Sequence, residues 1–224
     1  MLFLYCRYVV VPLESGLGIM KKAGILQVRI LIWVLKKAYS ESVGESYGTA
    51  VFVKEDGRLV TNAHVVTYKR LGIVNTFDEY SIRFAYEENY RLVELIKYDV
   101  EKDLAVLKLS DSAVKFDTLE IGDSEELEFG EKVYAIGNGS NYGLSITQGI
   151  VSTPKINIEY DGVRREVIQS DLTISAGNSG GALVDRRGKL IGITTFRTKD
   201  NQGEVIYGLV YSIPVAIVLE YVGA

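Results

Sequence analysis

The sequence is poor in the residues that cross-link a small protein or hold a metal in it. Among its 224 residues there is one cysteine, Cys6, and one histidine, His64. A single thiol cannot close a disulfide within the chain and supplies too few ligands for a metal cluster. A chain of this length buries about 70% or more of the surface of its unfolded state, so a hydrophobic core can stabilise it without either device. We therefore expect neither a metal nor a cofactor.

The composition also gives no sign of a nucleic-acid partner or of a membrane-spanning helix. The 25 Lys and Arg residues and the 29 Asp and Glu residues are interspersed and give a net charge of −4, so we expect no basic patch for nucleic acid. No uninterrupted apolar run reaches the ~18 residues of a membrane-spanning helix. Association with a membrane through an amino-terminal anchor remains an alternative, which the interrupted runs disfavour.

Residues 1–25 are an extension whose structure the sequence does not predict. If translation began at Met20, a secretory signal would be conceivable, but Gln27 and Arg29 interrupt its apolar segment. In residues 28–34 the β-branched side chains recur at every second position, which is typical of a strand. We expect residues 28–34 to form the first strand of a barrel rather than a signal or an anchor.

A serine among glycines is the feature around which the rest of the chain is organised. It lies in Gly177-Asn178-Ser179-Gly180-Gly181, directly before an apolar segment. Glycine has no Cβ, so this segment can turn tightly and leave room for a substrate backbone. The Gly177 and Ser179 N–H groups can then converge, which makes Gly177-Asn178-Ser179 a candidate oxyanion hole and Ser179 a candidate nucleophile.

A serine nucleophile requires a base and a carboxylate that orients the base. His64 is the only histidine, so it is the only imidazole available as the base. Asp103 immediately precedes the apolar residues 104–109, and burial at a strand start would let its carboxylate hold the imidazole tautomer. Less favoured carboxylates nearby are Asp99, Asp111 and Asp117.

Each of these signals is weak alone, because a lone histidine is often structural and a glycine-rich segment is often an ordinary loop. Their order along the chain, His-Asp-Ser, is that of chymotrypsin-like enzymes. Four segments in order resemble the high-temperature-requirement (HtrA/Deg) serine proteases over roughly residues 26–222. They are Thr61-Asn62-Ala63-His64-Val65-Val66, Asp103-Leu104-Ala105-Val106-Leu107-Lys108, Thr147-Gln148-Gly149-Ile150-Val151-Ser152 and Gly177-Asn178-Ser179-Gly180-Gly181.

This resemblance implies a serine endopeptidase that acts on unfolded or extended polypeptides in protein quality control. It also implies homotrimers and an extracytoplasmic site, whereas a cytoplasmic site would follow if the amino terminus is not a signal. Members commonly carry a carboxy-terminal PDZ domain, and we expect only the protease domain because the sequence ends at Ala224. A catalytically weak relative that acts as a chaperone or peptide-binding protein is the alternative.

The expected fold is all-β, a chymotrypsin-like double β-barrel with a short C-terminal helix. Short apolar segments separated by Gly, Asp and Asn turns favour barrels. We expect one barrel in residues 26–117, including a hairpin over residues 47–62, and a second in residues 118–224 that ends in a helix at 214–222. Residues 68–80 are polar enough to predict a loop.

Substrate preference rests on the resemblance at a few positions. Enzymes that cut after Lys or Arg carry an acid where this chain has Thr173, so basic specificity is not expected. Ile174 and Ile206 resemble the lining of the family's primary pocket, which favours small or medium aliphatic side chains. Residues that resemble the edge strand along which family substrates pair are Thr194, Thr195 and Phe196.

The chain departs from the family pattern near the predicted site. Ala176 stands where the family often has proline, and residues 137–143 replace a usual Gly-Asn-Pro-Phe-Gly. Loss of proline's fixed φ loosens both loops. We therefore expect the oxyanion loop to sample inactive conformations. The family usually has Gly-Ser-Gly at residues 47–49, and we expect this difference to alter a strand start and not the chemistry.

Overall fold

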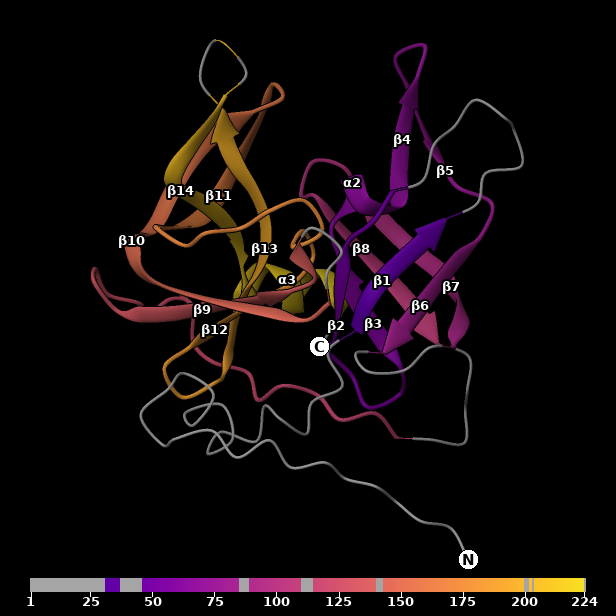
Figure 1. Cartoon of the computed structure of the whole chain (residues 1–224), viewed down its shortest axis with the longest axis horizontal. Coiled ribbons are helices and arrows are strands. Elements are labelled where there is room, and N and C mark those ends of the chain that lie inside the picture. Colours follow the sequence, from indigo (N-terminus) through magenta and orange to yellow (C-terminus); the bar gives the residue numbers. More distant parts are fainter. Residues whose placement is uncertain are drawn as a thin grey trace, which may run out of the picture.

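The computed structural model describes residues 31–36, 46–84, 89–109, 115–139, 143–199, 202 and 204–223. Within these residues the chain forms two closed antiparallel barrels that lie side by side (Figure 1). The fold is therefore the predicted all-β, chymotrypsin-like double barrel with a short C-terminal helix. The extension at 1–25 and residues 28–30 of the predicted first strand lie outside the described residues.

The first barrel has six strands in the order β1-β2-β3-β8-β7-β6. They are β1 (Leu31–Lys36), β2 (Thr49–Phe52), β3 (Arg58–Thr61), β6 (Tyr80–Phe84), β7 (Tyr90–Asp99) and β8 (Leu104–Leu109). The predicted hairpin is β2–β3, and its turn contains Gly57 at φ 89°. A Cβ on Gly57 would lie 2.9 Å from the Leu109 carbonyl oxygen, so this close approach requires glycine.

The second barrel also has six strands, in the order β10-β11-β14-β13-β12-β9. They are β9 (Lys132–Gly137), β10 (Ser145–Tyr160), β11 (Val163–Ser170), β12 (Ala182–Asp185), β13 (Leu190–Lys199) and β14 (Val205–Pro214). The β10–β11 hairpin turns at Asp161 and Gly162, both with positive φ, which is the two-residue turn that matches the twist of paired strands. The predicted division between residues 117 and 118 falls between the strands of the two barrels.

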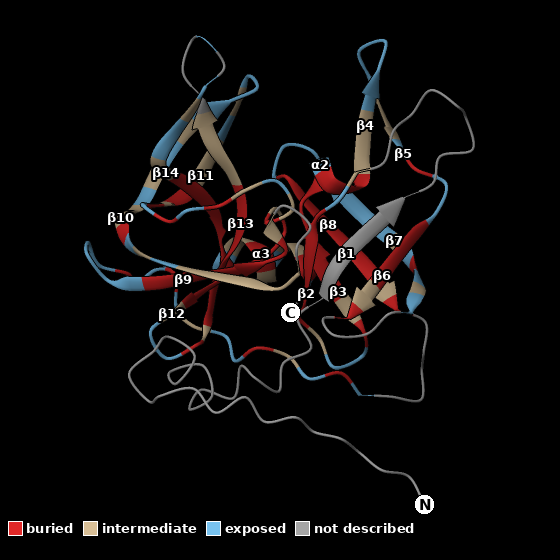
Figure 2. Ribbon diagram, in the orientation of Figure 1, coloured by how far each residue is buried: buried red, intermediate tan, exposed pale blue. Residues whose placement is uncertain are grey.

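A shared apolar core joins the barrels. Buried side chains of β2, β3 and β8 pack in one cluster with side chains of β9, β12, β13 and the helix α3 (Val215–Val222). Pro214 ends β14 and is the N-cap of α3, so the helix begins one residue after the predicted start at 214. Figure 2 shows the buried inner strands of both barrels facing this region, so the two barrels are fixed relative to one another. No helix among the described residues is long and apolar enough to cross a membrane.

The prediction of a loop over residues 68–80 is wrong. The chain there forms a hairpin of β4 (Thr67–Arg70) and β5 (Ile73–Thr76) that projects from the first barrel (Figure 1). Leu71 and Gly72 make its two-residue turn, with φ of 51° and 79°. Most of the hairpin is exposed, so no alternation of apolar and polar residues marks its strands in the sequence.

Candidate active site

His64 lies in a one-turn helix at the end of the β3 strand rather than in the strand itself. β3 ends at Thr61, and α2 (Ala63–Val66) begins two residues later. Ala63, Val65 and Val66 are buried, so α2 is anchored in the first barrel while 49% of the His64 side chain is exposed. The helix therefore holds the imidazole at the surface from a fixed backbone.

The structure brings Asp103 directly against His64. The imidazole Nδ1 lies 3.0 Å from Oδ1 and 2.9 Å from Oδ2 of the carboxylate. The His64 main-chain N–H also donates to Oδ1, at 3.0 Å, and so finds an acceptor that the short α2 helix does not provide. A proton on Nδ1 bonds this carboxylate, which leaves Nε2 as the basic nitrogen.

Asp103 is buried and is held by groups from both barrels. The Thr195 hydroxyl of β13 donates to Oδ2 at 2.5 Å, and the Asn62 amide donates to the Asp103 carbonyl oxygen at 3.0 Å. Burial tends to raise the pKa of the Asp103 carboxyl, but the hydrogen bonds and charge of His64 and the Thr195 hydroxyl outweigh it. The pKa of Asp103 is therefore held below its ordinary value, and the carboxylate is ionised at neutral pH.

Neither of the two rival carboxylates that the structure describes, Asp99 and Asp117, is hydrogen-bonded to His64. Asp99 accepts a hydrogen bond from the Lys102 N–H at 2.9 Å, within the turn between β7 and β8. Asp117 is exposed, and Asp111 lies outside the described residues. Among the described acids, the geometry favours Asp103 as the partner of the imidazole.

The glycine-rich segment forms a tight turn with two unused N–H groups. The Asn178 N–H donates to the Ser175 carbonyl at 3.1 Å, and Gly177 between them has φ 97°, which fits a type II turn. Within the described residues, neither the Gly177 nor the Ser179 N–H donates a hydrogen bond. Two free N–H groups flanking the nucleophile are what an oxyanion hole offers.

This turn is held against the first barrel through Thr49 of β2. The Thr49 N–H donates to the Ser179 carbonyl at 2.8 Å, and its hydroxyl donates to the Gly177 carbonyl at 2.7 Å. Gly180 has φ 82°, and a Cβ there would lie 2.1 Å from the Thr49 carbonyl oxygen. The residues at 47–49 therefore do more than begin a strand, because Thr49 orients the carbonyls of the predicted oxyanion turn.

The Ser179 hydroxyl is bonded away from the imidazole. Its Oγ donates to the Thr195 carbonyl at 2.9 Å. In the described part of the chain, no hydrogen bond joins Ser179 to His64. The two residues nevertheless line one cavity, of about 570 Å³.

That cavity also takes in most of the predicted substrate-binding residues. Ile174, Thr195 and Phe196 line it, and the Arg197 guanidinium donates to the Ile174 carbonyl at 3.0 Å. The main-chain groups of Thr194 are already bonded to Gly180 and Gly181, each at 2.8 Å. Ile206 does not line the cavity and is 36% exposed on β14.

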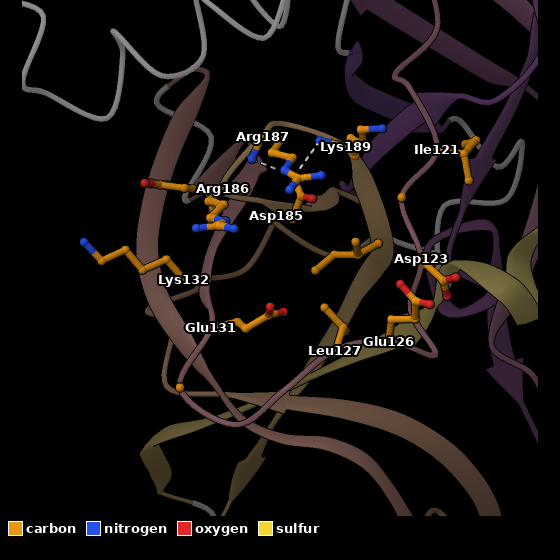
Figure 3. A pocket seen from close by; sticks show the side chains of 14 residues that line it. Ile121, Asp123, Glu126, Leu127, Glu131, Lys132, Asp185, Arg186, Arg187 and Lys189 are labelled. Carbon is orange, nitrogen blue, oxygen red and sulfur yellow. Dashed lines mark hydrogen bonds between the residues drawn. The ribbon is translucent and has the colours of Figure 1, made fainter.

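A larger hollow, of about 1080 Å³, lies elsewhere on the second barrel (Figure 3). Basic side chains of the β12–β13 turn and acidic side chains of the segment before β9 lie on opposite sides of it. It contains none of the predicted site residues and is open and mixed in charge. Among the described residues, no group of three or more His, Cys, Asp or Glu side chains is arranged to hold a metal ion.

The sequence profile of the trypsin-like peptidase domain matches residues 48–193, from the first residues of the β2 strand to β13. The chain belongs to this family of trypsin-like peptidases. Among curated relatives of this peptidase are the serine protease Do-like HtrA of Lactobacillus helveticus, 35% identical over 184 residues, and the serine endoprotease DegS of Escherichia coli K12, 36% identical over 171 residues. These alignments cover 80% and 75% of this chain.

Solved HtrA-type proteases have the same fold as this trypsin-like peptidase. The HtrA-type protease AlgW with tripeptide is 29% identical, with a TM-score of 0.75 over 92% of this chain and 62% of that one. AlgW with decapeptide is 26% identical, with a TM-score of 0.72 over 93% of this chain and 66% of that one. The peptidase spans 41% and 44% of the two curated relatives named above. It is therefore of the HtrA/Deg type over the region compared.

Sequence reasoning missed several residues that build this site. Thr195, a predicted substrate-binding residue, also donates its hydroxyl to Asp103, a contact that the sequence does not predict, while Asn62 and Thr49 orient backbone on the two sides of the cavity. The Tyr160 ring of the β10–β11 hairpin stacks on Phe196 at 4.0 Å. Small polar residues are common within and beside strands, so only the fold distinguishes Thr49, Asn62 and Thr195 from their neighbours.

Proposed function

We propose that this trypsin-like peptidase is an active serine endopeptidase that cleaves extended polypeptides through an acyl-enzyme intermediate. In this proposal Ser179 is the nucleophile, His64 the general base and Asp103 the residue that orients it. The observation that carries the proposal is the paired contact of the imidazole with a buried carboxylate, facing a cavity that Ser179 also lines.

The chemical steps follow from these positions. The Ser179 hydroxyl turns from the Thr195 carbonyl to Nε2 of His64, gives up its proton there and attacks the substrate carbonyl carbon. The oxyanion that forms accepts hydrogen bonds from the free Gly177 and Ser179 N–H groups. His64 then donates the proton to the leaving amine, and water repeats the sequence to release the acid and restore the serine.

The preference for side chains is proposed to be apolar rather than basic. Ile174 lines the cavity, and the Ile174 carbonyl accepts a hydrogen bond from the Arg197 guanidinium, so a cation lies beside this residue. A lysine or arginine of the substrate that approached Ile174 would be repelled by that guanidinium. A peptide library in which Arg is preferred to Val and Leu would contradict this preference.

Extended chains are the proposed substrates because of how β13 is paired. Up to Thr194 the strand is bonded on one side to Gly180, Gly181 and β12, and on the other to β14. β12 begins at Ala182, which pairs with Ile193, so β12 does not run alongside the part of β13 after Thr194. That part of β13 offers an edge for an added strand. Such main-chain pairing reads little sequence and suits unfolded polypeptides in protein quality control.

The compartment is proposed from the names of relatives, and the assembly from the family resemblance alone. A relative from Bartonella henselae, 35% identical over 172 residues, is named a probable periplasmic serine endoprotease. We extend an extracytoplasmic site and a homotrimer to this chain as expectations. Fractionation of the source cells and light scattering of the purified chain test the two separately.

A fluorophosphonate probe tests the proposed reaction directly. The wild-type chain should react at Ser179, located by mass spectrometry, and should cleave unfolded casein, whereas Ser179→Ala should do neither. Ser152→Ala is a matched control, because Ser152 lies on β10 and does not line the cavity. Equal casein cleavage by Ser179→Ala and wild type would refute the assignment.

A catalytically weak relative that holds unfolded chains is the second candidate. The hydrogen bond from Ser179 Oγ to the Thr195 carbonyl favours it, because a serine in this rotamer is not activated by the imidazole. In that case the probe should leave Ser179 unlabelled while the chain still suppresses aggregation of an unfolded protein. Labelling at Ser179 with turnover of casein would exclude this candidate.

A further inference from the structure

One arginine of the second barrel reaches across to the first barrel next to the candidate active site. Arg165 lies on β11, and its guanidinium extends to the turn that joins β7 to β8. Its Nε donates to the Glu101 carbonyl at 2.7 Å, and its Nη2 donates to the Val100 carbonyl at 2.9 Å. The two barrels are thus joined by two parallel hydrogen bonds to consecutive carbonyls.

The guanidinium is fixed on its own side as well. Its Nη1 donates to the Tyr160 carbonyl at 2.9 Å, at the opposite strand of the β10–β11 hairpin. The Tyr160 ring in turn stacks on Phe196 of β13 at 4.0 Å, with an angle of 17° between the rings. Because a guanidinium is planar and presents its donors in a fixed fork, three carbonyl partners determine where it lies.

The turn whose carbonyls Arg165 bonds ends at Asp103. Val100 and Glu101 are the third and second residues before Asp103 along the chain. Asp103 has φ 53°, a left-handed backbone conformation that is uncommon for residues with a Cβ, although aspartate adopts it more readily than most. The Asn62 amide holds the Asp103 carbonyl from one side, and Arg165 holds the approach to Asp103 from the other.

In the described part of the chain, the Arg165 guanidinium bonds carbonyl groups and not acidic side chains. Among the described residues it makes no ion pair, so its interactions at this site are with main-chain carbonyls. The neighbouring Arg164 is exposed on β11 and makes no such hydrogen bond among the same residues. Arg165, Val100, Asp103 and Tyr160 all line the cavity that holds His64 and Ser179.

We propose that Arg165 is a positioning residue: it holds the turn at residues 100–103 from the opposite barrel and so keeps the Asp103 carboxylate on Nδ1 of His64. The expected effect on turnover rests on the proposed function, whereas the effect on the imidazole does not. Release of the turn lets Asp103 relax from its left-handed conformation, and the carboxylate then moves relative to a ring that α2 holds in place. Displacements of about 1 Å at such a contact can cost on the order of 100-fold in rate.

The single histidine allows a direct test. Nitrogen-15 NMR of the full chain reports the tautomer of His64 without overlap, because no other imidazole is present. Wild type should show the Nδ1–H tautomer that the Asp103 contact selects. Arg165→Gln should shift the ring toward the Nε2–H tautomer, and Arg164→Gln, the matched control on the same strand, should leave it unchanged.

Kinetics complete the test and separate it from the proposed function. With a peptide substrate, Arg165→Gln should lower kcat about 10- to 100-fold with a smaller change in KM, and Arg164→Gln should match wild type. If the wild type has no peptidase activity, the proposed function fails, yet the NMR comparison still decides the role of Arg165. A wild-type tautomer in Arg165→Gln, or an equal shift in Arg164→Gln, would overturn the inference.

A second variant keeps the inference testable if Arg165→Gln does not fold. Arg165→Lys keeps the charge, but an ammonium group cannot span both carbonyls with the fork that the guanidinium provides. Folding of each variant is checked by near-UV circular dichroism. A partial shift of the His64 tautomer in Arg165→Lys supports the inference, and an unchanged wild-type spectrum in that variant counts against it.

Discussion

The two sides of the cavity are assembled by different means. On the first-barrel side, the His64 imidazole is hydrogen-bonded to the buried carboxylate of Asp103, and the Thr195 hydroxyl also donates to that carboxylate. On the second-barrel side, a glycine-rich turn presents main-chain groups, and the Ser179 hydroxyl bonds a carbonyl instead of the imidazole. The base is therefore oriented in advance, and the nucleophile has still to turn toward it.

Physical chemistry explains why the carboxylate side is the more firmly set. Hydrogen bonds to an ionised group are roughly twice as strong as bonds between neutral groups, and burial increases the cost of leaving Asp103 unpaired. A serine hydroxyl has three staggered rotamers and loses little by exchanging one neutral acceptor for another. The difference predicts that changes on the two sides have different consequences.

The largest effects should come from removing one reacting group on each side. Ser179→Ala and Asp103→Asn are each expected to lower kcat/KM for a peptide by about 10⁴-fold or more, because the attacking oxygen is lost in one and the imidazole tautomer in the other. Only Asp103→Asn should also destabilise the fold, since it replaces a buried, multiply bonded carboxylate. Peptide kinetics and urea unfolding of both variants measure this contrast.

Gly180→Ala should damage the nucleophile side through sterics. Its Cβ would lie 2.1 Å from the Thr49 carbonyl oxygen and 2.2 Å from the Thr61 hydroxyl. We expect a loss of about 3 kcal/mol or more in the free energy of unfolding, because backbone must move. Gly162→Ala is the control, since φ is 73° there but no atom lies within 4 Å of the added Cβ. Equal unfolding midpoints in the two variants would contradict the packing described here.

Thr195→Val should weaken the carboxylate side without removing it. The variant loses the hydroxyl that donates to Asp103 but keeps the carbonyl that Ser179 contacts. The loss of one hydrogen bond to a charged group should lower kcat by about 10-fold, and Thr195→Ser should restore most of it. A fall in both variants alike would point to packing of the Thr195 methyl group instead.

The smallest effect should be the response of stability to acid. The pKa of Asp103 in the folded chain lies below its ordinary value, so its contribution to stability is complete above the unfolded pKa, near pH 4. As the pH falls through the folded pKa, that contribution is lost. The free energy of unfolding of wild type should therefore fall more steeply below about pH 4 than that of Asp103→Asn, as urea titrations at fixed pH would measure. Parallel curves would show that Asp103 carries no such linkage.

The residues that sequence reasoning could identify are those with chemistry that few positions share. One histidine, one serine among glycines and one acid before a buried strand define His64, Ser179 and Asp103 as candidates, and the alternation of apolar residues predicts most barrel strands. The exposed β4–β5 hairpin leaves no such pattern. Arg165 and Thr49 bond groups of the opposite barrel, Asn62 bonds the carbonyl of a residue 41 positions along the chain, and the Ser179 rotamer depends on competition between two acceptors. Neither can be read from local sequence.

Closure of both barrels determines where the described part of the molecule can acquire extra strands. Both barrels close, yet several of their described strands run past the ends of a neighbour, and one such stretch is the part of β13 after Thr194, where pairing with β12 has ended. The separate β4–β5 ribbon has free edges, but the charges of Lys69 and Arg70 lie exposed along it and oppose pairing with another chain. An extended chain that paired with β13 after Thr194 would lie beside the cavity of His64 and Ser179, because Thr195, Phe196 and Arg197 line that cavity.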